Sequence, residues 1–168
     1  PHEQDSHRNR IDVLIDAARD SIEAALSHDL SLAQGYLQVW RSSSNAILRR
    51  LAVHGWRVRT DVGPDQKLTW LFEQNLLWDL ALQHEVFQLI RDALPSARED
   101  VARSLVDAAV AGPDGGADGE QSNYRIYNLL GWLEQSAPEL QIAAKAFEDA
   151  QAAHPEYDRR EHPDLNHY

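Results

Sequence analysis

The sequence predicts an all-α protein made of antiparallel helices. Apolar residues recur at intervals of three and four along most of the 168 residues, and no segment alternates between apolar and polar residues as a strand does. Short polar or proline-containing turns separate these segments, which is typical of helices that pack against their neighbours in the chain. Two architectures remain open, an irregular α-solenoid of the HEAT type and a multi-helix bundle. We favour the solenoid, although no clean repeat period is visible.

The first half of the chain is expected to form four helices. Asp29 is the predicted N-cap of the second helix, and the hydroxyls of residues 42–44 are the predicted caps of the third. Pro64 is expected to open the fourth helix, because proline is well tolerated in a first helical turn. The expected ranges are 8–27, 30–40, 45–56 and 64–75.

The second half is expected to form four more helices. Ser96 and Glu99 have the spacing of a capping box at the start of the sixth. The five tryptophans are spread over several helices, so we expect them to be buried or half-buried in helix packing. The expected ranges are 76–90 with a short turn inside it, 96–111, 122–136 and 138–153.

These elements predict one helical domain over residues 1–153. Within it, the glycine-rich and charged segment 112–120 is predicted to be a mobile loop. Residues 154–168 are predicted to form an extended tail that leads to further sequence. The chain contains no methionine, even at position 1, so we expect it to be a fragment of a longer protein.

Composition restricts the classes of function. The chain is 43% hydrophobic and 26% charged, as folded domains are, and it carries a net charge of −11. A strongly acidic chain repels phosphate backbones, so no nucleic-acid partner is expected. The chain has no cysteine, which excludes disulfides and thiolate metal sites and suits a cytoplasmic protein. No apolar run reaches the roughly 20 residues that cross a bilayer, so no membrane partner is expected.

One basic segment interrupts the acidic chain, with Arg41, Arg49, Arg50, Arg57 and Arg59 and no acidic residue between positions 41 and 60. Our main interpretation is a solvated helix face. The alternative is a catalytic pair, because the spacing of Arg49 and His54 resembles the motif of the HEPN ribonucleases. In that family the histidine and arginine act on the scissile phosphate, usually across a dimer interface. Arg50 departs from the family pattern, which favours asparagine or aspartate after the arginine.

The other patterns do not predict a reactive site. The pair His84–Glu85 lacks the second histidine of a zinc protease motif, since position 88 is Gln. The tail contains His154, His162 and His167 among acidic residues, but two of these histidines precede prolines and nothing fixes a ligand geometry. Glycine-rich phosphate loops and a serine nucleophile motif are absent from the sequence. We therefore predict no catalytic, cofactor-binding or metal site, and no cofactor.

Four segments carry a resemblance to a known group of proteins. They are LRRLAVHGWR at 48–57, GPDQKLTWLFEQNLLWD at 63–79, HEVFQLIRDALP at 84–95 and the tail at 153–168. Together they resemble the helical C-terminal region of large bacterial multidomain proteins that carry a sirtuin-like or nucleotide-binding effector, many of them associated with defence against phage. The resemblance implies a sensor or scaffold role, with any effector chemistry outside these residues.

The sequence therefore predicts a non-catalytic helical scaffold or recognition module. Its expected partners are other domains of the same polypeptide and a protein that the sequence does not identify. A HEPN-like ribonuclease that uses Arg49 and His54 is the alternative.

Overall fold

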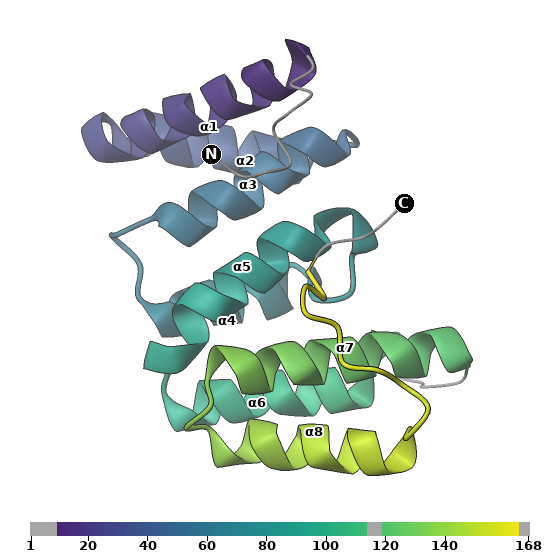
Figure 1. Ribbon diagram of the computed structural model, residues 1–168. Helices are drawn as coiled ribbons and strands as arrows, with labels where there is room; N and C mark the ends of the chain where they lie inside the picture. The colour runs from purple at the N-terminus through teal and green to yellow at the C-terminus, as the bar shows by residue number, and fades with distance from the viewer. Residues whose placement is uncertain (1–9, 114–118, 165–168) are drawn as a thin grey trace. The chain divides into compact units, whose positions relative to one another are not determined.

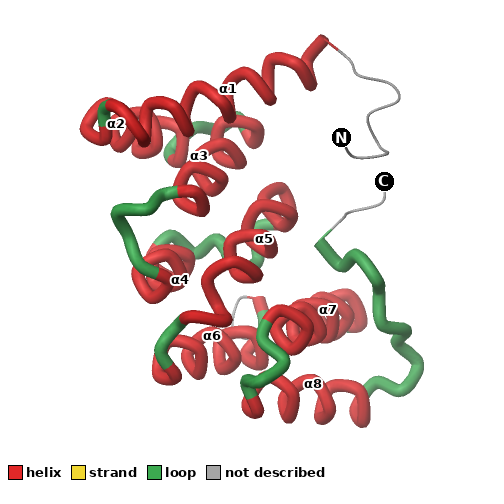
Figure 2. The backbone as a smooth tube through the Cα atoms, turned by 60° about the vertical axis from the view of Figure 1, so that its left-hand side comes forward, coloured by secondary structure: helices red, strands yellow, loops and turns green. Residues whose placement is uncertain are grey.

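The computed structural model describes residues 10–113 and 119–164, with side chains described from residue 13 onward. Within these ranges the chain forms eight α-helices and no strand, which confirms the all-α prediction. Figures 1 and 2 show the helices joined by short loops, with a longer non-helical segment after the last helix. Residues 114–118 of the predicted mobile loop lie outside the described ranges.

The backbone contacts group the chain into two compact units, residues 1–60 and residues 61–168. The sequence predicts one domain over residues 1–153, whereas the contacts divide these residues after Thr60. The boundary lies directly before residues 61–64, which lead into the next helix.

The first unit contains α1 (Arg10–His28), α2 (Leu30–Arg41) and α3 (Ala46–Val58). Its core is formed by apolar side chains that the three helices share, namely Ile22, Ala33 and Leu37, with Ala25, Leu26, Trp40 and Trp56 packed around them.

The caps of α2 and α3 test two sequence predictions. Asp29 accepts a hydrogen bond from the Leu32 amide at 3.0 Å, so its predicted role as the N-cap of α2 is confirmed. The cap of α3 is Asn45, which accepts from the Ile47 amide at 2.9 Å. Our assignment of this cap to the serines was therefore wrong. Ser43 instead accepts from the Asn45 amide and so holds the capping residue in place.

The second unit contains α4 (Pro64–Glu73), α5 (Gln83–Ala93), α6 (Glu99–Ala111), α7 (Glu120–Ser136) and α8 (Gln141–Ala153). The short 3-10 helices η2 (Leu80–Leu82) and η3 (Leu94–Ser96) flank α5. Pro64 opens α4 as predicted, with the Gln66 side chain accepting from the Gly63 amide at 3.0 Å.

Helix α7 is the centre of the second unit, and α5, α6 and α8 pack against it. All seven residues from Tyr127 to Leu133 are buried, so this helix is covered around its whole circumference for about two turns. The Trp132 indole donates a hydrogen bond to the Phe87 carbonyl of α5 at 2.8 Å, which satisfies a polar group inside the core. This arrangement around one helix is that of a multi-helix bundle.

The predicted capping box at the start of α6 is wrong. Ser96 lies in η3, and the N-cap of α6 is Arg98, which makes no side-chain cap. The Arg98 amide donates instead to Asp65 of α4 at 2.8 Å, and the Arg98 guanidinium pairs with the other oxygen of that carboxylate. A carboxylate 33 positions away therefore satisfies a backbone amide at the start of α6, in place of the predicted capping box.

The tryptophans are placed as expected. Trp70 and Trp132 are buried, and Trp40, Trp56 and Trp78 are half-buried. No helix among the described residues is long and apolar enough to cross a membrane.

Two glycines inside helices of the first unit give a matched test of its packing. An added Cβ at Gly55 of α3 would collide with the buried Leu37 side chain, whereas an added Cβ at Gly35 of α2 meets nothing within 4 Å. We expect Gly55→Ala to lower the free energy of unfolding by about 1–3 kcal/mol. We expect Gly35→Ala to raise it by about 0.5–1 kcal/mol, because alanine has the higher helix propensity. Urea unfolding measures both changes, and equal shifts would contradict this packing.

Candidate functional site

A groove of about 650 Å³ runs over the second unit between α6 and α8. Each of the three surrounding helices contributes residues spaced three or four apart, so one continuous face of each helix lines the groove. The lining is mainly apolar and includes Val106, Val110, Ile126, Leu130, Ile142 and Ala146. Val110 is 53% exposed. The groove is thus an apolar surface that the described residues leave open.

The rim of the groove is charged. Lys145 of α8 pairs with Asp149 at 2.7 Å, and this hydrogen bond is the main reason that the pKa of Lys145 lies above its ordinary value. Arg103 of α6 pairs with Glu99 at 2.9 Å. Asp107 is different, because it forms no hydrogen bond or ion pair with another described residue. The rim therefore offers an exposed carboxylate that a basic group could neutralise.

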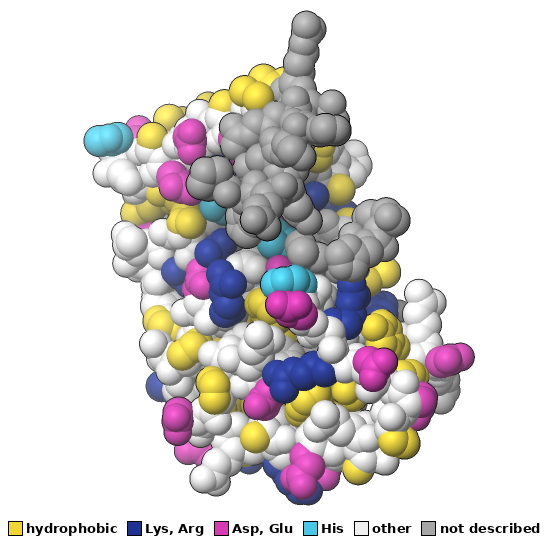
Figure 3. All heavy atoms as spheres, in the orientation of Figure 1, with side chains coloured by type: hydrophobic (Ala, Val, Ile, Leu, Met, Phe, Trp, Pro, Cys, Tyr) yellow, Lys and Arg dark blue, Asp and Glu magenta, His cyan; other side chains and the backbone are white. Residues whose placement is uncertain are grey.

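Figure 3 shows one face of the molecule, where charged side chains of both signs are interspersed with apolar ones. The two units differ in charge balance. Residues 1–60 contain eight basic and seven acidic residues, whereas residues 61–168 contain eight basic and twenty acidic residues. The groove thus belongs to the acidic unit.

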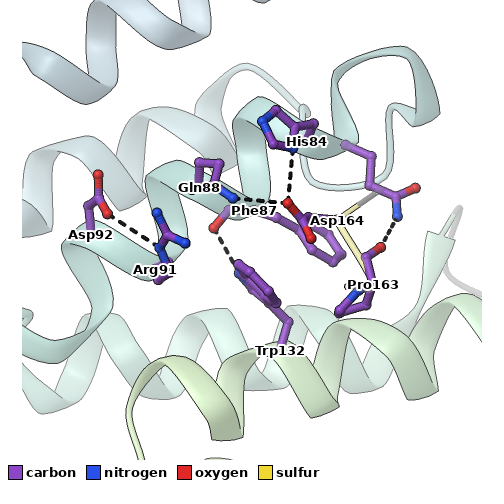
Figure 4. A network of polar contacts seen from close by, with 9 residues as sticks. His84, Phe87, Gln88, Arg91, Asp92, Trp132, Pro163 and Asp164 are labelled. Carbon is purple, nitrogen blue, oxygen red and sulfur yellow. Dashed lines mark hydrogen bonds and ion pairs between the residues drawn. The ribbon is translucent and has the colours of Figure 1, made fainter. Parts of the chain in front are cut away.

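The segment after α8 is fastened to α5 by a buried carboxylate (Figure 4). Asp164 is 5% exposed and accepts hydrogen bonds on Oδ2 from His84 Nδ1 and Gln88 Nε2, each at 2.9 Å. Gln83 donates to the Pro163 carbonyl at 2.6 Å. The second carboxylate oxygen, Oδ1, is buried without a hydrogen-bond partner among the described residues. The predicted extended tail is therefore docked through residue 164.

The network also shifts the pKa of Asp164. Burial by itself raises this pKa, but the hydrogen bonds from His84 and Gln88 and the charge of His84 outweigh burial, so the pKa lies below its ordinary value of 3.8. The carboxylate is thus charged at neutral pH, and its charged form is the one that the contacts stabilise.

Two further side chains hold the tail. The Tyr157 ring meets Tyr124 and Tyr127 of α7 edge-on, with centroids 5.2 and 5.5 Å apart, and its hydroxyl donates to the Glu120 carbonyl. Arg159 pairs with Glu134 of α7 at 2.6 Å and lies over the Phe147 ring of α8. The docked tail thus contacts α5, α7 and α8.

The alternative catalytic pair lies on α3 of the first unit. His54 Nε2 is bound to Glu23 of α1 at 2.7 Å. Arg49 lies five residues before His54 on the same helix. The shared cleft that Arg49 and His54 would form across a dimer interface stays a prediction.

The histidines of the tail are engaged with nearby side chains. His154 interacts with Glu156 at 3.1 Å and stacks on Tyr157, and His162 Nε2 lies 3.9 Å from a carboxylate oxygen of Glu161. His167 lies outside the described residues. In the part of the chain that the structure describes, no three histidine or carboxylate side chains gather as a metal site would require.

Comparisons with protein-family models, with curated proteins and with solved structures found no match for this chain. The resemblance to helical regions of sirtuin-like bacterial proteins therefore stays a prediction. Sequence reasoning missed both the groove and the docked tail. The tail could not be placed from local sequence, because Asp164 lies 80 residues from its partner His84.

The tail offers a matched pair of aspartates. Asp164→Asn removes the charge that His84 binds and leaves a buried amide group without a partner, so we expect the tail to loosen. Trypsin cleavage after Arg159 and Arg160 should then be at least about fivefold faster, because cleavage follows the population of the open form. Asp158→Asn is the control, because Asp158 is exposed and has no interaction with another described residue. Equal cleavage of the two variants would contradict the docking.

The lowered pKa of Asp164 sets the pH dependence of this contribution. A carboxyl group with a depressed folded pKa stabilises the fold above its unfolded value of 3.8, and the contribution disappears as pH falls through the still lower folded value. Urea unfolding at about pH 7 should show Asp164→Asn to be less stable than the wild type by about 1–3 kcal/mol. At about pH 2 the difference should shrink strongly. A difference that persists in acid would mean that the charge of Asp164 is not its cause.

Proposed function

We propose that this chain is a recognition module, and that its groove between α6 and α8 binds a basic amphipathic helix of a protein partner. The observation that carries the proposal is the open apolar groove of about 650 Å³, which is lined by a face from each of three helices. Apolar grooves between helices are a recurring way to bind an amphipathic helix.

The dimensions of the groove support an elongated ligand. On α8 the lining residues extend from Gln141 to His154, and at 1.5 Å per residue this is about 20 Å. A helix of about 13 residues has the same length. The aliphatic lining supplies contacts for residues on one face of such a helix.

The charge of the unit around the groove supports a basic ligand. Asp107 stands on the α6 wall with no ion pair to another described residue, and the surrounding unit has twenty acidic and eight basic residues. Charge complementarity of this kind steers association and selects among partners. A helix with lysine or arginine beside its apolar stripe is therefore favoured over an acidic one.

The role of scaffold or sensor that the resemblance implies is compatible with such a groove. The proposal needs no reaction at the site, because binding alone brings the partner to the rest of the polypeptide. We therefore propose no enzymatic activity for this chain.

Synthetic peptides test the proposal directly. A labelled helical peptide of about 15 residues, with leucines along one face and lysines beside them, should bind the full chain in a fluorescence anisotropy titration. The same peptide with glutamates in place of the lysines should bind at least about tenfold more weakly.

Two lysine substitutions on α6 locate the binding. Val110→Lys places a charge on the apolar lining. It should lower the affinity for the lysine peptide at least about tenfold, which is about 1.4 kcal/mol of binding free energy. Ser104→Lys adds the same charge to the same helix at an exposed position outside the lining, so the affinity should change less than about threefold. If both variants bind the peptide as the wild type does, the groove is not the binding surface.

A further inference from the structure

A second, smaller pocket of about 280 Å³ lies in the second unit at the amino-terminal end of α5. Four parts of the chain form it: the segment 77–80, the first turns of α5, the first turns of α7, and the docked tail. Its charged lining residues are Asp79, Arg125 and Arg160, and the other residues that its chemistry depends on are Trp78, Phe87, Tyr124 and Asn128. Nothing in the proposed helix-binding role uses this pocket.

Two arginines converge on the pocket within a strongly acidic unit. Residues 61–168 contain only eight basic residues, and two of them, Arg125 and Arg160, line this one cavity. The Arg125 guanidinium lies 5.5 Å from the centre of the Trp78 ring and donates a hydrogen bond to the Trp78 carbonyl. Trp78 therefore holds this cation at the pocket wall. The lining also contains the carboxylate of Asp79, so two guanidinium groups against one carboxylate leave a net positive charge, which favours an anionic ligand.

The other lining residues favour a planar ring. Three aromatic side chains, those of Trp78, Phe87 and Tyr124, border the cavity. Aromatic rings bind other planar rings through stacked or edge-on contacts. The lining therefore combines apolar planar surfaces with positive charge.

Asn128 adds a hydrogen-bonding group. Its side chain is 8% exposed, and its Nδ2 donates to the Tyr124 carbonyl at 2.9 Å. Its side-chain oxygen makes no hydrogen bond to another described residue. This oxygen is not among the buried polar atoms that lack a partner, so it remains accessible as an acceptor, and a ligand that donates a hydrogen bond can use it.

We propose that this pocket binds a small aromatic carboxylate that carries a hydrogen-bond donor on its ring. The volume lies just below the roughly 300–1,000 Å³ of most small-molecule sites, which suits a single ring with one charged group. A carboxylate matches the planar fork of a guanidinium. It also brings one negative charge into an acidic unit, where a phosphate monoester would bring about two.

The pocket contains both of its arginines only when the tail is docked, because Arg160 belongs to the tail that Asp164 fastens to α5. Ligand binding and tail docking therefore stabilise each other, since a ligand favours the state that it binds. Bound ligand should slow trypsin cleavage of the tail, and a substitution that loosens the tail should lower the affinity for the ligand.

Calorimetric titration of the full chain with 4-aminobenzoate tests the proposal. This probe has the ring, the carboxylate and an amino donor, and we expect a Kd below about 1 mM. Aniline lacks the carboxylate and cyclohexanecarboxylate lacks the planar ring, so both should bind at least about tenfold more weakly. No binding of 4-aminobenzoate at 10-fold this concentration, about 10 mM, would overturn the proposal. So would equal binding of aniline.

Substitutions of single arginines test whether the ligand binds in this pocket. Arg160→Gln removes a cation of the pocket and should weaken 4-aminobenzoate at least about tenfold. Arg91→Gln is the control, because Arg91 is an exposed residue of α5 that pairs with Asp92 and does not line the pocket. Asp164 also lies outside the pocket lining. Asp164→Asn should nevertheless lower the affinity for 4-aminobenzoate, because it releases the tail that carries Arg160. Unchanged affinity in Arg160→Gln, or an equal loss in Arg91→Gln, would show that the ligand does not bind here.

Discussion

The second unit depends on one constraint, the burial of α7 around its whole circumference from Tyr127 to Leu133. A helix covered on all sides needs a neighbour on each face, and here α5, α6, α8 and the tail provide them. Small and polar residues then acquire specific roles. Gly131 leaves room for Phe147, since an added Cβ would lie 3.1 Å from that ring. Trp132 can be buried at low cost because its indole nitrogen donates a hydrogen bond to the Phe87 carbonyl.

The same constraint explains why both proposed sites use α7. Ile126 and Leu130 line the groove, whereas Tyr124, Arg125 and Asn128 line the small pocket. At 100° per residue these two sets lie on roughly opposite sides of the helix. On one side the apolar groove lies between α6 and α8, and on the other the docked tail adds Arg160 to a cavity with charged lining residues. One rigid element therefore positions two surfaces of different chemistry.

Local sequence signals predicted the helices well, because apolar periodicity and the end signals of Pro64 and Asp29 depend on residues close together in the chain. These signals failed to predict hydrogen bonds whose two residues lie far apart in the sequence. Asp65, and not the predicted capping box, accepts a hydrogen bond from the Arg98 amide at the start of α6, and His84 binds a carboxylate 80 residues away. The groove could not be predicted from the sequence for a different reason. Periodicity marks Val110 and Ile142 as apolar face residues, but it does not say whether another helix covers them. The pocket needs Arg125 and Arg160 together, and only the docked tail brings them to one cavity.

The central claim is that α7 presents two independent surfaces, and amide chemical-shift mapping by NMR tests it most directly. On titration with the lysine-rich helical peptide, the account predicts shifts at Asn123, Ile126 and Leu130 of α7 and along α6 and α8. On titration with 4-aminobenzoate it predicts shifts at Tyr124, Arg125 and Asn128 and in the tail. Shifts of the same α7 residues by both ligands, or shifts confined to residues outside these lining sets, would contradict it.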